Sequence, residues 1–203
     1  MPTLSRMLDR LLEGSMRVAR IAVFAGGSTI LMSAFLISFD VVMRRFFGVS
    51  TWGADELSYY ALAISSSWAF GYALLIKAHI RIDLVTARLP GAGKAALHIV
   101  ALLATGFLAL TASQAMLHIF MRSWSRGTSS ITTLQTPLWI PQGLFLAGLL
   151  FFTLVTILLL LRVIVALAER NFELVERVAG SSTIEEETEQ AVAEATAARR
   201  IVS

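Results

Sequence analysis

Histidine is the residue type in this sequence best suited to bind a haem iron. His98 and His118 lie on one long apolar segment, 20 residues or about 30 Å apart if that segment is helical. Two axial ligands would have to come from facing helices at matching depths, and no second apolar segment carries a histidine. We therefore interpret both as polar packing residues and expect no cofactor, metal site or catalytic residue in this chain.

Carboxylates are the other groups that could do chemistry, as ion-coupling or proton-transfer sites inside a membrane. Asp40, Asp55 and Glu56 lie at or near one predicted membrane boundary, and none lies at mid-depth. A stand-alone transporter coupled to protons or sodium is expected to carry a central carboxylate, so the sequence points away from one. Cysteine is absent, which excludes disulfides, thiolate zinc sites and thiol catalysis.

Four apolar segments must position these residues, and nearly all of the charge lies between them. The 203 residues are 56% hydrophobic and only 15% charged. A span needs about 20 apolar residues, and a backbone inside the bilayer must bond to itself as a helix. The sequence predicts an all-α integral membrane protein with four transmembrane helices, at residues 21–39, 57–76, 95–121 and 138–161. No basic run is interleaved with aromatic residues, so nucleic acid is not an expected partner.

Basic residues set the expected orientation, because Lys and Arg gather on the cytoplasmic side of membrane proteins. With the N-terminus inside, eleven of them lie by the inner ends of the spans and four lie in the outer loops. We therefore predict that both termini are cytoplasmic. Residues 1–14 are expected to form an amphipathic helix in the membrane interface, or else a tilted start of the first span. Residues 77–90 form either a second such helix or a basic loop, and residues 171–203 form a polar cytoplasmic tail after the 15–170 membrane domain.

Small and polar residues at helical spacing mark candidate packing faces on two spans. These residues are Ala63, Ser67 and Gly71 on the second span, and Thr111, Gln114 and His118 on the third. Small residues at this spacing allow helix backbones to approach closely. The polar face either contacts a partner, lines a substrate path, or bonds to neighbouring helices of the same bundle.

The charges of the first outer hairpin can pair in two ways. Asp40 and Arg44 lie one helical turn apart, whereas Arg44 or Arg45 could instead reach Glu56. Either pairing would brace the hairpin, and the alternative is that water and headgroups solvate these charges. Indole rings favour the headgroup region, and three tryptophans fall at predicted outer boundaries: Trp52, Trp124 and Trp139.

Three motifs lie at the ends of the spans. The first is Asp40-Val-Val-Met-Arg44-Arg-Phe-Phe-Gly48, followed by Trp52 and Glu56. The second is His79-Ile-Arg-Ile-Asp83, with Pro90 after it, and the third is Thr136-Pro137-Leu-Trp139-Ile-Pro141-Gln-Gly143. In order and spacing they resemble the small membrane subunit of tripartite ATP-independent periplasmic (TRAP) transporters, the DctQ type, over roughly residues 15 to 170.

This resemblance implies a scaffold that works beside a large permease subunit and a periplasmic solute-binding protein in the bacterial inner membrane. It implies sodium-driven uptake of an organic acid, with sodium and substrate carried by the large subunit and no enzyme activity. Because the chain ends at Ser203, we expect the large subunit to be a separate chain. Outer residues would then form part of the dock for the binding protein: Arg44, Arg45, Trp52, Asp55, Glu56, Arg122 and Arg126.

Two other functions stay open on the residues alone. One is a small autonomous transporter that acts as a dimer, which the missing central carboxylate disfavours. The other is a membrane anchor subunit of a redox enzyme, which would need a cofactor that the histidine positions do not favour.

Overall fold

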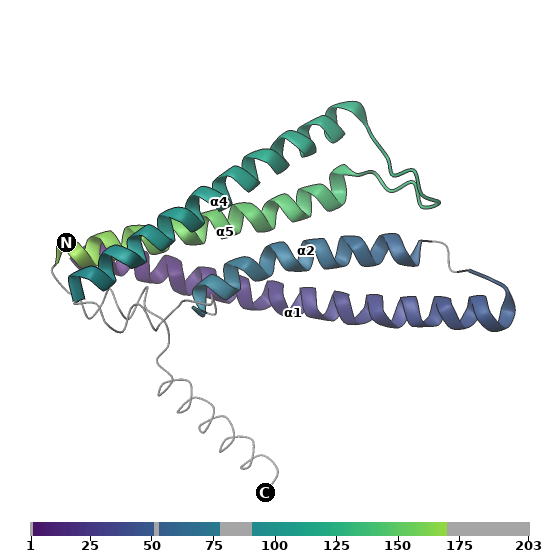
Figure 1. The fold of residues 1–203 in the computed structure, drawn as a ribbon, viewed down its shortest axis with the longest axis horizontal. Helices are drawn as coiled ribbons and strands as arrows, with labels where there is room; N and C mark the ends of the chain where they lie inside the picture. The colour runs from purple at the N-terminus through teal and green to yellow at the C-terminus, as the bar shows by residue number, and fades with distance from the viewer. Residues whose placement is uncertain (1, 51–52, 78–90, 170–203) are drawn as a thin grey trace, which may run out of the picture.

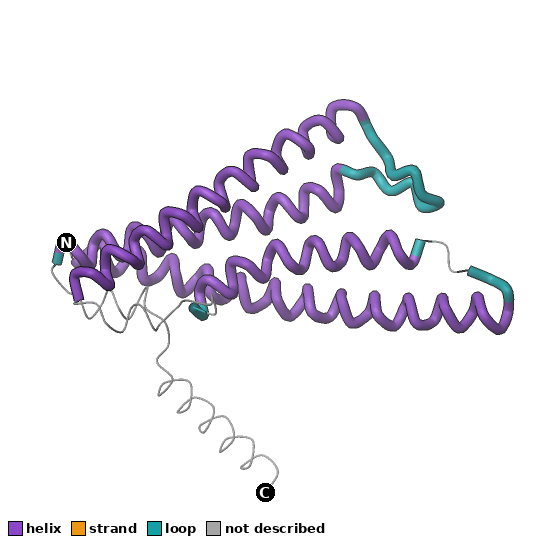
Figure 2. The backbone as a smooth tube through the Cα atoms, in the orientation of Figure 1, coloured by secondary structure: helices purple, strands orange, loops and turns teal. Residues whose placement is uncertain are grey.

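Four helices make up the part of the chain that the computed structural model describes, residues 2–50, 53–77 and 91–169 (Figures 1 and 2). Helix α1 is Pro2–Phe47, α2 is Ala54–Leu75, α4 is Gly91–Arg126 and α5 is Trp139–Ala168. Each predicted span overlaps one of these helices. The β contact in this part of the chain is a single bridge between Ser129 and Pro137. The all-helical prediction is therefore confirmed for the described residues.

Helices α1, α4 and α5 are long and apolar enough to cross a membrane. Helix α2 has 22 residues, but it contains no stretch as hydropathic as those of the other three helices. Its first turn holds Asp55 and Glu56, and the serines at 65, 66 and 67 lie in its middle. That α2 also crosses the membrane stays a prediction.

Helix α1 is continuous over 46 residues, from Pro2 to Phe47. Of the two alternatives for the first segment, residues 2–14 form the direct start of α1 rather than a separate helix. Their apolar stripe is partly covered, since Leu8 is buried while Met7 and Leu11 are exposed. Their location in the membrane interface stays a prediction.

The helices lie side by side in the order α1, α2, α5, α4 (Figure 1). Helices α1 and α2 form one antiparallel pair, and α4 and α5 form the other. Helix α5 packs against α1, α2 and α4, so it joins the two pairs. The pairs diverge toward the end opposite the start of α1, where the loops predicted to be outer lie; we call this the outer end of the bundle and the opposite one the inner end.

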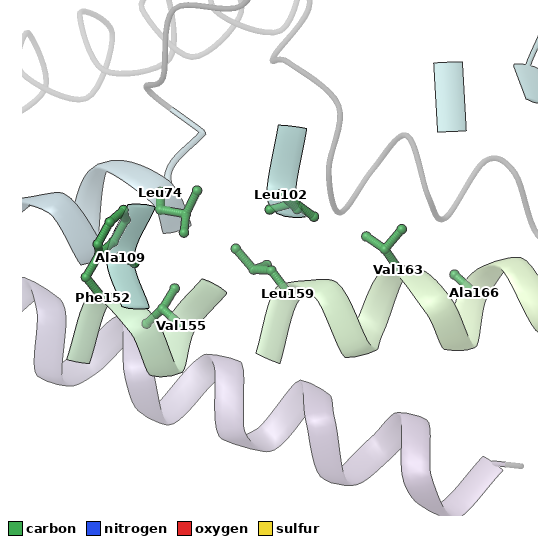
Figure 3. Close-up of a cluster of buried hydrophobic side chains, with 8 residues drawn as sticks. All are labelled: Leu74, Leu102, Ala109, Phe152, Val155, Leu159, Val163 and Ala166. Atoms are coloured by element: carbon green, nitrogen blue, oxygen red, sulfur yellow. The ribbon is translucent and has the colours of Figure 1, made fainter. Parts of the chain in front are cut away.

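The hydrophobic core is built mainly by α5, the most apolar of the four helices. Five of its side chains, Phe152, Val155, Leu159, Val163 and Ala166, form a buried cluster (Figure 3). Their spacing of three or four residues places them on one side of the helix. Helix α2 contributes Leu74, and α4 contributes Leu102 and Ala109.

Small residues bring α5 and α1 close to α2. A Cβ atom added at Gly148 of α5 would lie 2.2 Å from the Ser67 Oγ, and one added at Gly71 would lie 2.7 Å from the Phe151 ring. On the other side of α2, the Ser65 Oγ donates to the Gly26 carbonyl oxygen of α1 at 3.0 Å. The backbone of α2 therefore lies close to the backbones of both α1 and α5, which small residues at the contacts allow.

Helix α5 continues beyond the predicted end of the fourth span at Leu161, as far as Ala168. The sequence places Arg162 at that end as a basic flanking residue, but it is buried in the structure. Its Nε donates to Asp9 Oδ1 at 2.7 Å and its Nη2 to Asp9 Oδ2 at 3.2 Å. These two charge-assisted hydrogen bonds allow the guanidinium to be buried in the bundle.

Candidate functional site

The outer end of α1 is fixed by Asp40, which is only 2% exposed. Arg44, one turn later, donates to Asp40 Oδ2, and the Ser50 Oγ donates to Oδ1 at 3.2 Å. Of the alternatives left open for these charges, the structure shows the pairing of Asp40 with Arg44. Ser50 lies beyond the helix end, so this carboxylate also holds the chain as it turns toward α2.

Glu56, in the first turn of α2, is buried and bonds to hydroxyl groups. It accepts from the Thr132 Oγ1 and, at 2.6 Å, from the Tyr60 Oη. Within the described part of the chain, Glu56 therefore pairs with neither Arg44 nor Arg45. Hydrogen bonds from Thr132, and then from Tyr60, lower the pKa of Glu56 from 4.5 to about 2, against the opposing effect of burial. Glu56 is a charged acceptor that gathers donors from two segments far apart in sequence.

Thr132 belongs to a short hairpin between α4 and α5, residues 127–138, which we call the outer hairpin, whereas Tyr60 lies one turn further along α2. The Ser130 N–H donates to the Thr136 carbonyl at 2.9 Å, and the Leu138 N–H donates to the Thr128 carbonyl at 3.0 Å. Gly127, with φ of +59°, lets the chain leave α4 in the left-handed conformation that commonly ends a helix. The spacing of residues in this segment does not predict a hairpin.

The outer hairpin lies over the start of α2. Besides the bond from Thr132 to Glu56, the Leu134 side chain lies against Gly53, the residue before α2. A Cβ at Gly53 would be 2.2 Å from the Leu134 Cδ1, and the φ of +95° at this position also requires glycine. The α4–α5 pair therefore contacts the α1–α2 pair at the outer end as well as through the core.

Aromatic side chains cover the base of the outer hairpin. Trp124, near the end of α4, meets Trp139, the first residue of α5, edge to face at 4.8 Å between ring centroids. Pro141, in the first turn of α5, is buried, and Pro137 takes part in the bridge to Ser129. The family-motif residues of this segment are thus packing and turn residues. Trp52, His79 and Asp83 lie outside the described residues.

Exposed charges gather at the same end of the bundle. Arg44 and Arg45 end α1, Asp55 begins α2, and Arg122 and Arg126 end α4. Because the helices alternate in direction, all five lie at the end that carries the outer hairpin (Figure 1). Of the predicted dock residues, Glu56 differs by being buried beneath the outer hairpin.

The predicted packing faces divide into covered and open residues. On α2, Ser67 and Gly71 are buried against α5, whereas Ala63 is exposed. On α4, Thr111, Gln114 and His118 are all exposed. The Thr111 Oγ1 donates to the Phe107 carbonyl of its own helix at 2.9 Å.

The polar contact that does join α4 to α5 involves other residues. The hydroxyl oxygens of Ser113 and Thr153 lie 3.0 Å apart in a buried hydrogen bond. His98 is buried on α4. The sequence analysis did not single out Ser113 or Thr153, since one hydroxyl in an apolar helix identifies no particular partner.

Three of the four helices are long and apolar enough to cross a membrane, and the polar contacts described above gather at one end of the bundle. These features are typical of an integral membrane protein. The chain matches the family described as "Tripartite ATP-independent periplasmic transporters, DctQ component" over residues 15–166. It belongs to that family and is a small subunit of a TRAP transporter. No match was found among curated proteins or among solved structures.

Proposed function

We propose that this chain is the fixed scaffold subunit of a sodium-driven transporter for an organic acid in the bacterial inner membrane. It acts with a separate large permease subunit, which carries the substrate and sodium sites, and with a periplasmic solute-binding protein. The family match over residues 15–166 is the observation that carries this proposal. The spans without formal charge support it, because a transport site needs polar or charged ligands at mid-depth.

The proposed topology has four membrane crossings and both termini in the cytoplasm. Helix α2 is about 33 Å long by its 22 residues. It lies antiparallel between α1 and α5, both of which are able to cross a membrane. A helix of bilayer length that packs between two such neighbours is expected to cross the same bilayer. The distribution of Lys and Arg between the two ends supports the orientation.

The large subunit is proposed to contact the open polar face of α4. Thr111, Gln114 and His118 are exposed in the structure, although they lie within a predicted span. Polar side chains that face lipid are costly, and in membrane proteins they usually face a partner or another helix. Ser67 and Gly71 are used inside the chain, so they are not part of this surface.

The binding protein is proposed to dock at the outer end of the bundle. The exposed charges of Arg44, Arg45, Asp55, Arg122 and Arg126, with Trp52, form the contact surface. Buried Glu56 would act indirectly, by holding the outer hairpin against α2. Rim charges of this kind guide a transient encounter more than they add affinity.

Charge reversal at the end of α4 tests this dock. In proteoliposomes that hold this chain, the large permease and the binding protein, we expect R122E/R126E to lower uptake roughly tenfold at limiting binding protein. The assay follows the organic acid that the purified binding protein retains, and co-purification checks that the membrane complex is intact. The control R6E/R10E reverses two exposed charges at the other end. Unchanged uptake of R122E/R126E at both limiting and saturating binding protein would refute the dock.

Reconstitution of this chain alone tests the scaffold role. We expect no sodium-dependent flux without the large permease, and uptake when the large permease and the binding protein are added. Coupled flux by this chain alone would establish the autonomous transporter instead. A visible haem or flavin absorbance in the purified protein would establish the redox anchor.

A further inference from the structure

A groove of about 600 Å³ lies at the inner end of the bundle, between α1, α2 and α5. Four apolar side chains line it: Leu12 and Met16 of α1, Leu75 of α2 and Leu159 of α5. Leu12, Leu75 and Leu159 also belong to the hydrophobic core or pack against it. The floor of the groove is therefore a continuation of the core that the described residues leave open.

The rim of this groove carries an excess of positive charge. Arg17 and Arg20 of α1 line it, together with Lys77 after α2. The acidic residues on the rim are Asp9 and Glu13. Asp9 is neutralised by Arg162 through two hydrogen bonds, at 2.7 and 3.2 Å.

Glu13 can therefore offset only one of Arg17 and Arg20, which leaves a positive charge on the rim. Arg17 and Arg20 are exposed, and across the described ranges neither forms an ion pair with a carboxylate. At the end of a membrane-spanning bundle, cations above an apolar groove match a ligand with a negative head and a hydrocarbon tail.

We propose that this groove binds an anionic phospholipid. Its phosphate lies against Arg17 and Arg20, and one acyl chain lies along the floor formed by Leu12, Met16, Leu75 and Leu159. Inorganic phosphate or a free headgroup would gain nothing from this apolar floor, so the lipid is favoured over both. A zwitterionic lipid brings a choline close to the same cations, so it binds more weakly. The inference concerns this chain alone and does not depend on the proposed partners.

Native mass spectrometry of the full chain, purified in detergent and titrated with lipid, tests the proposal. The probes are phosphatidylglycerol, phosphatidylcholine with the same acyl chains, and soluble glycerol phosphate. Each cation near a membrane surface contributes roughly fivefold to the affinity for anionic lipid, so R17Q/R20Q should bind phosphatidylglycerol about 30-fold more weakly. The single variant R20Q, expected to lose about fivefold, serves if the double variant does not fold.

The matched control is R6Q/R10Q, which removes two exposed arginines from the same helix and the same end but outside the groove. We expect this variant to keep its affinity for phosphatidylglycerol, and R17K/R20K to keep most of it. Equal losses in R6Q/R10Q and R17Q/R20Q would overturn the proposal in favour of diffuse surface charge. Equal binding of phosphatidylcholine, or full competition by glycerol phosphate, would overturn it as well.

Discussion

Helix α2 meets α5 at Gly148, where the structure leaves no space for a side chain. A Cβ atom at this position would lie 2.2 Å from the Ser67 Oγ and 2.9 Å from the Ser67 carbonyl carbon. The hydroxyl could rotate away only by giving up its 2.8 Å bond to the Ile64 carbonyl, and the backbone carbon cannot rotate away at all. Gly148→Ala therefore forces the two helices apart, which is an overpacking defect worth about 1–3 kcal/mol.

Thermal unfolding of the purified chain in detergent, followed by circular dichroism, measures this cost. For a chain of this size, we expect Gly148→Ala to lower the unfolding temperature by on the order of 5 °C. The control is Gly27→Ala, because no other side chain or neighbouring helix lies within 4 Å of a Cβ at that exposed position. Alanine there replaces a poor helix former, so stability should be unchanged or higher.

A second substitution shows whether the contact with Ser67 is the cause. Ser67→Ala removes the Oγ at 2.2 Å but leaves the Ser67 carbonyl carbon and Cβ, each 2.9 Å from the added methyl group. The double variant Gly148→Ala/Ser67→Ala should therefore recover part of the lost stability but not all of it. If Gly148→Ala unfolds at the same temperature as Gly27→Ala, the close α2–α5 contact is not as described and the reasoning fails.

Two further predictions concern the polar contacts at the ends of the bundle. Asp9→Asn should lower the free energy of unfolding by about 2 kcal/mol, because Arg162 stays buried without its charged partner, although Asp9 itself is half exposed. Asp9→Asn/Arg162→Met should recover most of this, since Arg162 Nη1 is already buried without a hydrogen-bond partner among the described residues. Glu56 should stabilise the fold above its unfolded pKa of 4.5 and lose this effect as the pH falls toward about 2. The stability difference between wild type and Glu56→Gln should therefore shrink from about pH 6 to about pH 3.

Each of these predictions has its own control. The Asp9 and Arg162 variants form a double-mutant cycle, and additive effects of the two single substitutions would show that the pair does not interact. For Glu56, Asp55→Asn alters an exposed carboxylate in the same helix turn. A pH dependence that persists unchanged in Glu56→Gln would assign it to other groups.

Local contacts were predictable from the sequence, because helical spacing alone defines them. Asp40 and Arg44 lie four residues apart, and their pairing follows from the helix geometry. The positions of the helices followed from the lengths of the apolar segments. The burial of Arg162 was not predictable, because its partner Asp9 is 153 residues away and no local pattern connects the two.

Contacts between distant segments were not predictable in the same way. Thr132 lies 76 residues from Glu56 in a loop of many similar hydroxyls, so nothing in the sequence marks it as the partner. The small-residue face of α2 was predicted from its spacing, but the helix that packs on it was not. Spacing shows that another helix can approach closely, but it does not show which helix does so. Ser67 and Gly71 contact α5 of the same chain.

The central position of α5 has a consequence for how the protein is made. Helices leave the ribosome in order, and α5 emerges last of the four. Until it is inserted, the newly made α1–α2 pair and α4 lack the helix that supplies five of the eight residues in the buried cluster. We therefore expect assembly to wait for the final insertion event, and any chain cut short before residue 139 to become a substrate for membrane quality-control proteases.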